Sequence, residues 1–239
     1  MTGLPRALLL DMDDTILDDS ATVEQCWDRT CAAFAGPAGV EAAPFRAAVQ
    51  AEKDWFWSDR DRHRVGRLDL DAARASIIAG ALRRMGREGN GVAAEAARAY
   101  ARCRREAVRP FPGALEALAA FRDRGTRLAL ITNGASDVQR EKIGRFGLAP
   151  FFDGIFIEGE MGFGKPDERV FHRALEAVGA EPKDAWVVGD NLEWEVVPAK
   201  RLGMGAVWVD PAGLGLEIHR EATAVRPDRV VRGIRELLA

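Results

Sequence analysis

The chain has 239 residues, 47% of them hydrophobic and 30% charged, and its 34 Lys and Arg residues against 37 Asp and Glu residues give a net charge of −3. This composition is typical of a globular protein and excludes a disordered or fibrous one. A net charge so near zero gives no reason to expect a nucleic-acid polymer or a membrane surface as partner, and no apolar run reaches the ~18 residues of a membrane span.

The first predicted strand is the apolar run Ala7–Leu10, and the pattern that follows it is helical up to residue 109. Glycine, proline and polar breaks, including one at Asp59–Gly66, separate four predicted helices. These helices are expected at Thr22–Phe34, Ala43–Trp57, Asp71–Met85 and Ala93–Glu106. We therefore predict an inserted all-helical domain over residues 18–109.

From residue 110 onward, strands alternate with helices. Strands are expected at Leu128–Ile131, Gly154–Ile157, Ala185–Val188 and Ala206–Val209, and helices at Gly113–Arg124, Ser136–Phe146, Glu168–Val178, Glu195–Leu202 and Asp228–Leu238, the last with Asp228 as N-cap. This alternation predicts an α/β fold with a parallel, doubly wound sheet, formed by residues 1–17 and 110–239.

The three cysteines, Cys26, Cys31 and Cys103, are odd in number and lack the spacing of a zinc site or a C-x-x-C redox pair. We interpret them as reduced, and the compartment as cytoplasmic. The apolar run Ala7–Leu10 is followed at once by acidic residues, which is unlike a signal peptide.

Basic residues show two biases. Only five are lysines, at 53, 142, 165, 183 and 200. A GC-rich genome is the simpler explanation, but a lysine at a special place in such a chain hints that a compact point charge is needed there. The segment 18–108 has 15 basic and 14 acidic residues, so its charge is +1 and that of the remainder is −4.

Two aspartates, Asp11 and Asp13, directly follow the first predicted strand. The carboxyl ends of strands are where open α/β sheets bind ligands. In a pair of carboxylates, one can attack phosphorus while the other exchanges a proton with the leaving and attacking oxygens. The alternative is an acidic turn in which Asp13 or Asp14 caps the next helix.

Two further strand ends carry groups suited to phosphate. The hydroxyl and turn amides of Thr132–Gly134 can cradle phosphate oxygens, although Thr-Asn-Gly is also a common turn. Lys165, between a glycine and a proline, offers a fixed cation, although a solvated loop lysine is the simpler interpretation.

The fourth strand end carries Asp190, after Val187–Gly189. Together with Asp11 it would bind a hard cation through oxygen, in the manner of Mg²⁺. Capping of the following helix by Asp190 or Asn191 is the alternative.

Taken together and in this order, the four motifs resemble those of the haloacid dehalogenase-like (HAD) superfamily. The resemblance rests on D-x-D-x-T at Asp11–Thr15, on Thr132, on Lys165 and on Gly189–Asp190, and it covers nearly the whole chain. It implies a Rossmann-like core, and the helical insertion looks like a C1-type cap.

The resemblance implies a role for each motif. Asp11 would be the nucleophile that forms an aspartyl-phosphate, and Asp13 the general acid and then the general base. Thr132 and the Asn133 backbone would hold the phosphoryl group, and Lys165 would orient Asp11 and neutralise charge. The implied ligands of Mg²⁺ are Asp11, the Asp13 carbonyl and Asp190.

One position departs from the family pattern. Many members carry a second aspartate shortly after the position of Asp190, where this chain has Glu193 and Glu195. We expect Glu195 to be the substitute and, because its side chain is longer, to reach the metal through water.

Within the superfamily, Asp13 points to a phosphatase, because only an oxygen leaving group needs the second acid and 2-haloacid dehalogenases lack it. The predicted activity is Mg²⁺-dependent hydrolysis of a small phosphate monoester, either a nucleotide monophosphate or a sugar or sugar-acid phosphate. The main alternative is a phosphomutase of the β-phosphoglucomutase type, which usually has glycine at the position of Asp14. A HAD-like binding module without activity is disfavoured by the intact motifs.

The insertion is expected to select the substrate. In a segment dense in aromatic residues and arginines, Trp55 or Trp57 would stack on a base or sugar, and Arg60, His63 or Arg64 would bind an anionic or hydroxylated group. In the alternative interpretation the aromatic residues pack inside the insertion and the arginines are solvated. The only partner expected is a small phosphate ester, for a monomer or a homodimer.

Overall fold

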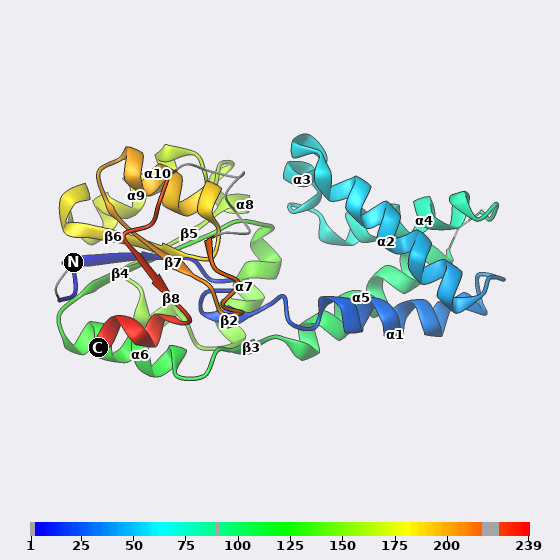
Figure 1. Cartoon of the computed structure of the whole chain (residues 1–239), viewed down its shortest axis with the longest axis horizontal. Helices are drawn as coiled ribbons and strands as arrows, with labels where there is room; N and C mark the ends of the chain where they lie inside the picture. The colour runs from blue at the N-terminus through cyan, green and yellow to red at the C-terminus, as the bar shows by residue number, and fades with distance from the viewer. Residues whose placement is uncertain (1–2, 89–90, 217–224) are drawn as a thin grey trace. The chain divides into compact units, whose positions relative to one another are not determined.

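A parallel sheet of six strands forms the centre of one part of the chain (Figure 1). In spatial order the strands are β5 (Gly154–Ile157), β4 (Arg127–Thr132), β1 (Ala7–Leu10), β6 (Ala185–Gly189), β7 (Gly205–Val209) and β8 (Arg229–Val231). Every neighbouring pair is parallel, so all the carboxyl ends lie at one edge. The predicted α/β class is confirmed.

The structure, a computed structural model, describes residues 3–88, 91–216 and 225–239. Its contacts divide the chain into two units. The first, here called the core unit, comprises Met1–Asp18 and Arg109–Ala239, and the second, the inserted unit, comprises Asp19–Val108. The antiparallel pair β2 (Leu17–Asp18) and β3 (Arg109–Pro110) joins the outgoing and returning chain.

Helices cover both faces of the sheet. α9 (Glu168–Val178) and α10 (Val197–Arg201) lie on one face, and α6 (Ala114–Asp123) with the 3₁₀ helix η5 (Ile234–Leu238) lies on the other (Figure 1). The other helical segments in the described part of the core unit are α7 (Ser136–Arg145), α8 (Glu158–Met161), η1 (Ala149–Phe151), η2 (Pro182–Asp184) and the π-helical turn η3 (Leu192–Val196).

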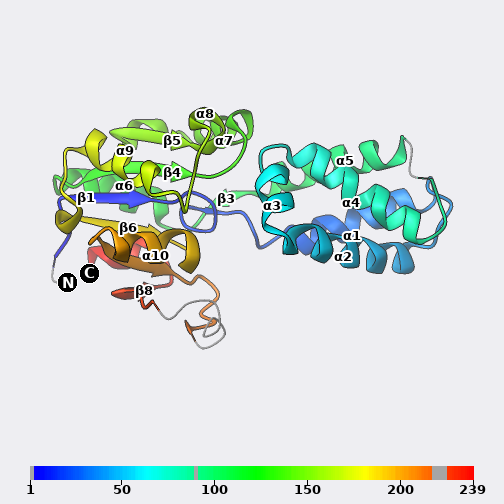
Figure 2. The same ribbon diagram turned by 90° about the horizontal axis from the view of Figure 1, so that it is seen from above.

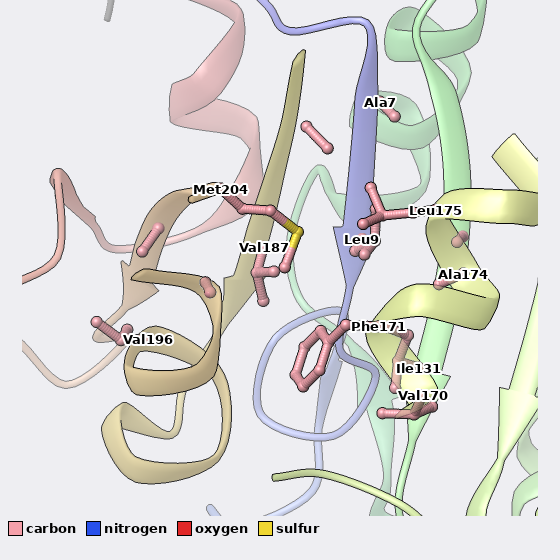
Figure 3. Close-up of a cluster of buried hydrophobic side chains, with 14 of the residues drawn as sticks. Ala7, Leu9, Ile131, Val170, Phe171, Ala174, Leu175, Val187, Val196 and Met204 are labelled. Atoms are coloured by element: carbon pink, nitrogen blue, oxygen red, sulfur yellow. The ribbon is translucent and has the colours of Figure 1, made fainter. Parts of the chain in front are cut away.

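A buried apolar cluster between the strands and α9 stabilises the sheet. Leu9 and Val187 project from β1 and β6, and Phe171 and Leu175 pack on them from α9 (Figure 3). All four residues of β1 are fully buried, as expected for the central strand of a sheet covered on both faces. This packing holds the strand ends, and the groups that follow them, in fixed positions.

The predicted C-terminal helix at Asp228–Leu238 is wrong. Residues 229–231 extend the sheet as β8, and only Ile234–Leu238 is helical, as the 3₁₀ helix η5. Asp228 does not cap a helix: its carboxylate accepts hydrogen bonds from the Ala206 amide at 2.9 Å and from Lys200 Nζ at 2.6 Å. Pairing with β7 satisfies the backbone of β8 and outweighs the helical pattern.

The inserted unit is all-helical (Figure 2). Its helices are α1 (Val23–Ala35), α2 (Ala42–Ser58), α3 (Arg60–Gly66), α4 (Leu70–Arg84) and α5 (Val92–Ala107). The break predicted at Asp59–Gly66 is wrong, because that stretch forms α3. Asp59 caps it by accepting a hydrogen bond from the Arg62 amide at 2.9 Å, so only this one residue separates α2 from α3.

The structure pairs Cys26 of α1 with Cys103 of α5 in a disulfide, and Cys31 remains a free, buried thiol. The interpretation of all three cysteines as reduced therefore disagrees with the structure. The two paired residues are 77 positions apart, and only the packing of α1 against α5 brings their Cα atoms to 5.7 Å. Among the described helices, none has the length and apolar character needed to cross a bilayer.

Candidate active site

Three charged side chains meet at the carboxyl end of the sheet. Asp11 directly follows β1, and its amide still bonds to the Val188 carbonyl of β6 at 2.9 Å. Lys165 Nζ donates to the Asp11 carboxylate and, at 2.7 Å, to Glu195 Oε1. All three side chains are buried, so each charge depends on the others for compensation.

Asp190 joins two of these residues in a carboxylate cluster. One oxygen from each of Asp11, Asp190 and Glu195 lies within 4.8 Å of the other two. The Asp190 backbone is held by Trp208, whose indole Nε1 donates to its carbonyl at 2.7 Å. Asn191 caps the following turn, so Asp190 does not serve as the helix cap that its position after β6 also allowed.

The pKa values at this cluster show an excess of negative charge. Burial, together with Glu195 and Asp13, raises the pKa of Asp11 to about 7 against the opposing effect of Lys165. Burial and the neighbouring acids, Glu195 first, raise the pKa of Asp190 to about 9. Burial alone would lower the pKa of Lys165, but Asp11 and Glu195 outweigh it and raise that pKa. One ammonium group therefore does not balance the carboxylates, and a divalent cation bound by oxygen ligands would complete the balance.

Glu195 reaches this cluster because of the residue at the end of β6. A Cβ atom at Gly189 would lie 1.9 Å from Glu195 Oε2, so only glycine leaves room for the carboxylate. The π-helical turn η3 directs Glu195 back toward the strand end, where it accepts the Asn191 amide at 2.7 Å. Direct contact with Lys165 is a role that the sequence did not indicate.

Thr132 and Asn133 lie at the end of β4. Thr132 is buried, and its Oγ1 accepts a hydrogen bond from Gln139 Nε2. The Asn133 side chain pairs with the Lys165 backbone in both directions, at 2.7 and 2.8 Å. At Gly164 a Cβ atom would lie 2.4 Å from Asn133 Oδ1, so this glycine permits the pairing. Asn133 thus holds the loop that carries Lys165.

The carboxylate of Asp13 accepts from Gln139 Nε2 at 2.9 Å and lies 2.8 Å from Lys142 Nζ. The chain then turns into β2, and the next helix starts only at Val23, so neither Asp13 nor Asp14 caps it. Asp14 adopts a positive φ of 60°, a conformation that glycine and aspartate both tolerate. The same backbone would accommodate the glycine usual in the mutases.

The candidate specificity residues lie in the inserted unit. Trp55, on α2, is exposed, and the Arg62 guanidinium lies 3.9 Å from its ring centroid. Trp57, on α2, is half-buried against Phe56, with ring centroids 4.9 Å apart, and against His63 at 5.2 Å. Arg60 and Arg64 are exposed on α3. Trp57 and His63 thus contribute to packing at the α2–α3 junction, and the arginines face solvent within their own unit.

Gln139 and Lys142, both on α7, are the site residues that the motifs did not reveal. The scarcity of lysine was the available signal: two of the five lysines, Lys142 and Lys165, contact the two aspartates that follow β1. Gln139 carried no such signal, because its place in the site depends on tertiary contacts that bring it to Thr132 at the end of β4.

Comparison with known proteins places these features in context. A family model described as "haloacid dehalogenase-like hydrolase" matches residues 5–203. Phosphoserine phosphatase from Thermus thermophilus is 36% identical over 97% of both chains. Glyceraldehyde 3-phosphate phosphatase from Methanopyrus kandleri is 29% identical over 84% of this chain and 82% of its own. Among solved structures, the HAD-hydrolase YfnB from Bacillus subtilis superposes with a TM-score of 0.71 at 23% identity, covering 98% and 97% of the two chains, which supports the fold.

Proposed function

The chain belongs to the haloacid dehalogenase-like hydrolase family, and on this basis we propose that it is a phosphatase that hydrolyses a small phosphate monoester through an aspartyl-phosphate on Asp11. The observation that carries the proposal is the cluster at the carboxyl end of the sheet, where Asp11 and Lys165 are buried in contact and Asp13 stands two residues further on.

In the first step a carboxylate oxygen of Asp11 attacks phosphorus, and the bond from phosphorus to the ester oxygen breaks. Asp13 donates a proton to that oxygen, which leaves as an alcohol. Lys165 holds Asp11 in place and offsets the charge on the transferring group. Phosphoryl transfer depends mainly on this positioning and neutralisation.

In the second step water attacks phosphorus of the aspartyl-phosphate, and Asp13 accepts its proton. The bond between phosphorus and Asp11 breaks, which releases inorganic phosphate and restores the carboxylate. The Thr132 hydroxyl and the backbone amide of Asn133 would bind phosphoryl oxygens throughout, because they lie at the end of β4, the strand beside β1.

The carboxylate cluster fits Mg²⁺, since its donors are all oxygens and its negative charge exceeds what Lys165 balances. Asp11, Asp190 and the Asp13 carbonyl would hold the ion, and Glu195 is close enough to contact it or a water bound to it. When bound, Mg²⁺ supplies charge neutralisation for the phosphoryl oxygens and favours the ionised form of Asp11.

The proposed substrates are small phosphate esters with a polar leaving group. Sugar-acid and nucleotide phosphates fit the chemistry of the site, and two of the relatives above are named for phosphoserine and for glyceraldehyde 3-phosphate, both three-carbon esters. We therefore place three-carbon phosphates, with or without a carboxylate, first among the candidates.

The test is a phosphate-release screen of the purified protein with Mg²⁺ across many phosphate esters, with Asp11→Asn as the blank. We expect at least one small ester to be hydrolysed by the wild type and none by Asp11→Asn. Full activity of that variant would overturn the proposal. Conversion of a hexose 1-phosphate into the 6-phosphate without phosphate release would favour the mutase instead.

A further inference from the structure

Two side chains of one helix, α7, contact the Asp13 carboxylate. Gln139 Nε2 donates to Oδ2 at 2.9 Å, and Lys142 Nζ lies 2.8 Å from Oδ1. Each carboxylate oxygen therefore has its own donor. Residues three apart on a helix share a face, so α7 presents both donors to the same target. Two fixed contacts set the direction of the carboxylate as well as its position.

Gln139 also links Asp13 to the end of β4, the strand beside β1. Its side chain is only 2% exposed, and the same Nε2 also donates to Thr132 Oγ1. One amide group thus sets the spacing between the Asp13 carboxylate and the hydroxyl that is proposed to bind the phosphoryl group. Asp13 lies beyond the end of β1, so the strand itself does not set the direction of its carboxylate.

Lys142 contributes charge from a sheltered position. Its side chain is 14% exposed and that of Asp13 is 28% exposed, so the pair is shielded more than ordinary surface pairs, which contribute little. The other lysine of the site, Lys165, contacts Asp11 in a similar way. Asp11 and Asp13 therefore each have a lysine partner of their own.

We propose that Gln139 and Lys142 are positioning residues that aim the Asp13 carboxyl group at the ester oxygen that leaves. The proposal rests on the phosphatase function above and adds to it. In the wild type, one Asp13 oxygen keeps its contact with α7 while the other leaves its donor, carries the proton and faces the ester oxygen. Without the contacts from α7 the carboxyl group turns freely, and proton donation to the leaving group becomes the slow part of phosphoryl transfer.

The experiment measures kcat/KM with Mg²⁺ for 4-nitrophenyl, phenyl and 4-methoxyphenyl phosphates. A nitrophenolate leaves well without a proton, whereas the other two leaving groups need one. We expect Lys142→Met and Gln139→Leu to lose about tenfold or more on the two poorer leaving groups and less than about threefold on 4-nitrophenyl phosphate. Lys142→Arg should restore most of the loss, because it keeps a charged donor.

Two reference variants interpret the result. Lys183→Met removes an exposed lysine of the same unit and should change no rate. Asp13→Asn should show the leaving-group dependence at its steepest. If Asp13→Asn shows none, the role of Asp13 in the proposed function is wrong. If it does but Lys142→Met and Gln139→Leu lose equally on all three esters, or lose nothing, then the positioning role is overturned while the phosphatase proposal stands.

Discussion

The core unit and the inserted unit use charged side chains in opposite ways. In the inserted unit, Glu24 accepts from Lys53 at 2.5 Å and also pairs with Arg46. The hydrogen bond from Lys53 is the main reason why the pKa of Glu24 is lowered. At the carboxyl end of the sheet, burial raises the pKa of Asp11 even though Lys165 touches it.

The two groups of charges differ in their exposure to solvent and in the number of cations available to each carboxylate. Glu24 is 58% exposed and is shared by two cations, so water and both partners stabilise its charge. Asp11, Asp190 and Glu195 cluster around one ammonium group, that of Lys165, and burial raises the pKa values of Asp11 and Asp190. In the ion pairs that join helices of the inserted unit, positive and negative charges are balanced. The cluster at the end of the sheet has excess negative charge, which favours binding of a further cation. The predictions below test this contrast.

The largest effect is expected when the same substitution is made in both places. Lys165→Met removes the cation that contacts buried Asp11 and Glu195 and should reduce kcat by about 10³ or more, because the transferring charge loses its fixed partner. Lys53→Met removes a partner from an exposed glutamate and should leave kcat unchanged and shift stability by less than about 1 kcal/mol. Steady-state kinetics and thermal melts measure both, and equal losses of activity would contradict the contrast.

The next effect concerns the affinity for Mg²⁺. Glu195→Gln keeps the shape of the side chain but removes one negative charge from the cluster, so the Mg²⁺ concentration that gives half-maximal activity should rise about 10- to 100-fold. Gly189→Ala should act in the same direction, since a Cβ atom there displaces the Glu195 carboxylate. Exposed Glu193 lies two residues before Glu195, and Glu193→Gln is the matched control. An unchanged Mg²⁺ requirement in Glu195→Gln would show that this carboxylate is not part of the metal site.

A moderate effect is expected on stability as a function of pH. Raised carboxyl pKa values mean that the folded protein holds protons that the unfolded chain releases, so their contribution is present below about pH 4 and is lost as the pH rises through about 7 for Asp11 and about 9 for Asp190. In EDTA, the melting temperature should therefore fall between pH 5 and pH 9. Mg²⁺ should offset this fall, and most strongly at the alkaline end.

The control for this series is Asp190→Asn, which removes the largest of these shifts. Its melting temperature in EDTA should depend less on pH than that of the wild type, and Mg²⁺ should raise it less. A wild-type melting temperature in EDTA that is flat, or rises, from pH 5 to pH 9 would contradict the interpretation of the cluster as carrying excess negative charge.

The sequence was sufficient to predict five of the six strands of the sheet, β8 being the exception, and the charged residues that follow them. β1, β5 and β7 lie within a residue of their predicted bounds, because a buried parallel strand is an apolar run between turns. The sequence was not sufficient for features that depend on packing between segments far apart in the chain. β8 depends on its pairing with β7, and the Cys26–Cys103 bond depends on α1 lying against α5. Gln139 enters the site only through its contacts with Asp13 and Thr132. Each of these is a contact between segments that the local pattern cannot reveal.

The smallest effect is expected in the inserted unit, where the hypothesis of substrate selection is still a prediction. Arg60 and Arg64 are exposed, so changing either to alanine should alter stability by less than about 0.5 kcal/mol. If one of them binds an anionic leaving group, its alanine variant should lower kcat/KM for phosphoserine up to about tenfold relative to 4-nitrophenyl phosphate, whose leaving group carries no carboxylate.

Trp57→Ala separates selection from packing in the same unit. Because Trp57 packs on Phe56 and His63, this variant should lose about 1–3 kcal/mol of stability, and its preference between the two esters should remain that of the wild type. A preference that changes in Trp57→Ala but in neither arginine variant would assign recognition of the leaving group to the aromatic residue. Arg60 and Arg64 would then have no role in substrate recognition. The charged residues that act in the reaction would all belong to the core unit.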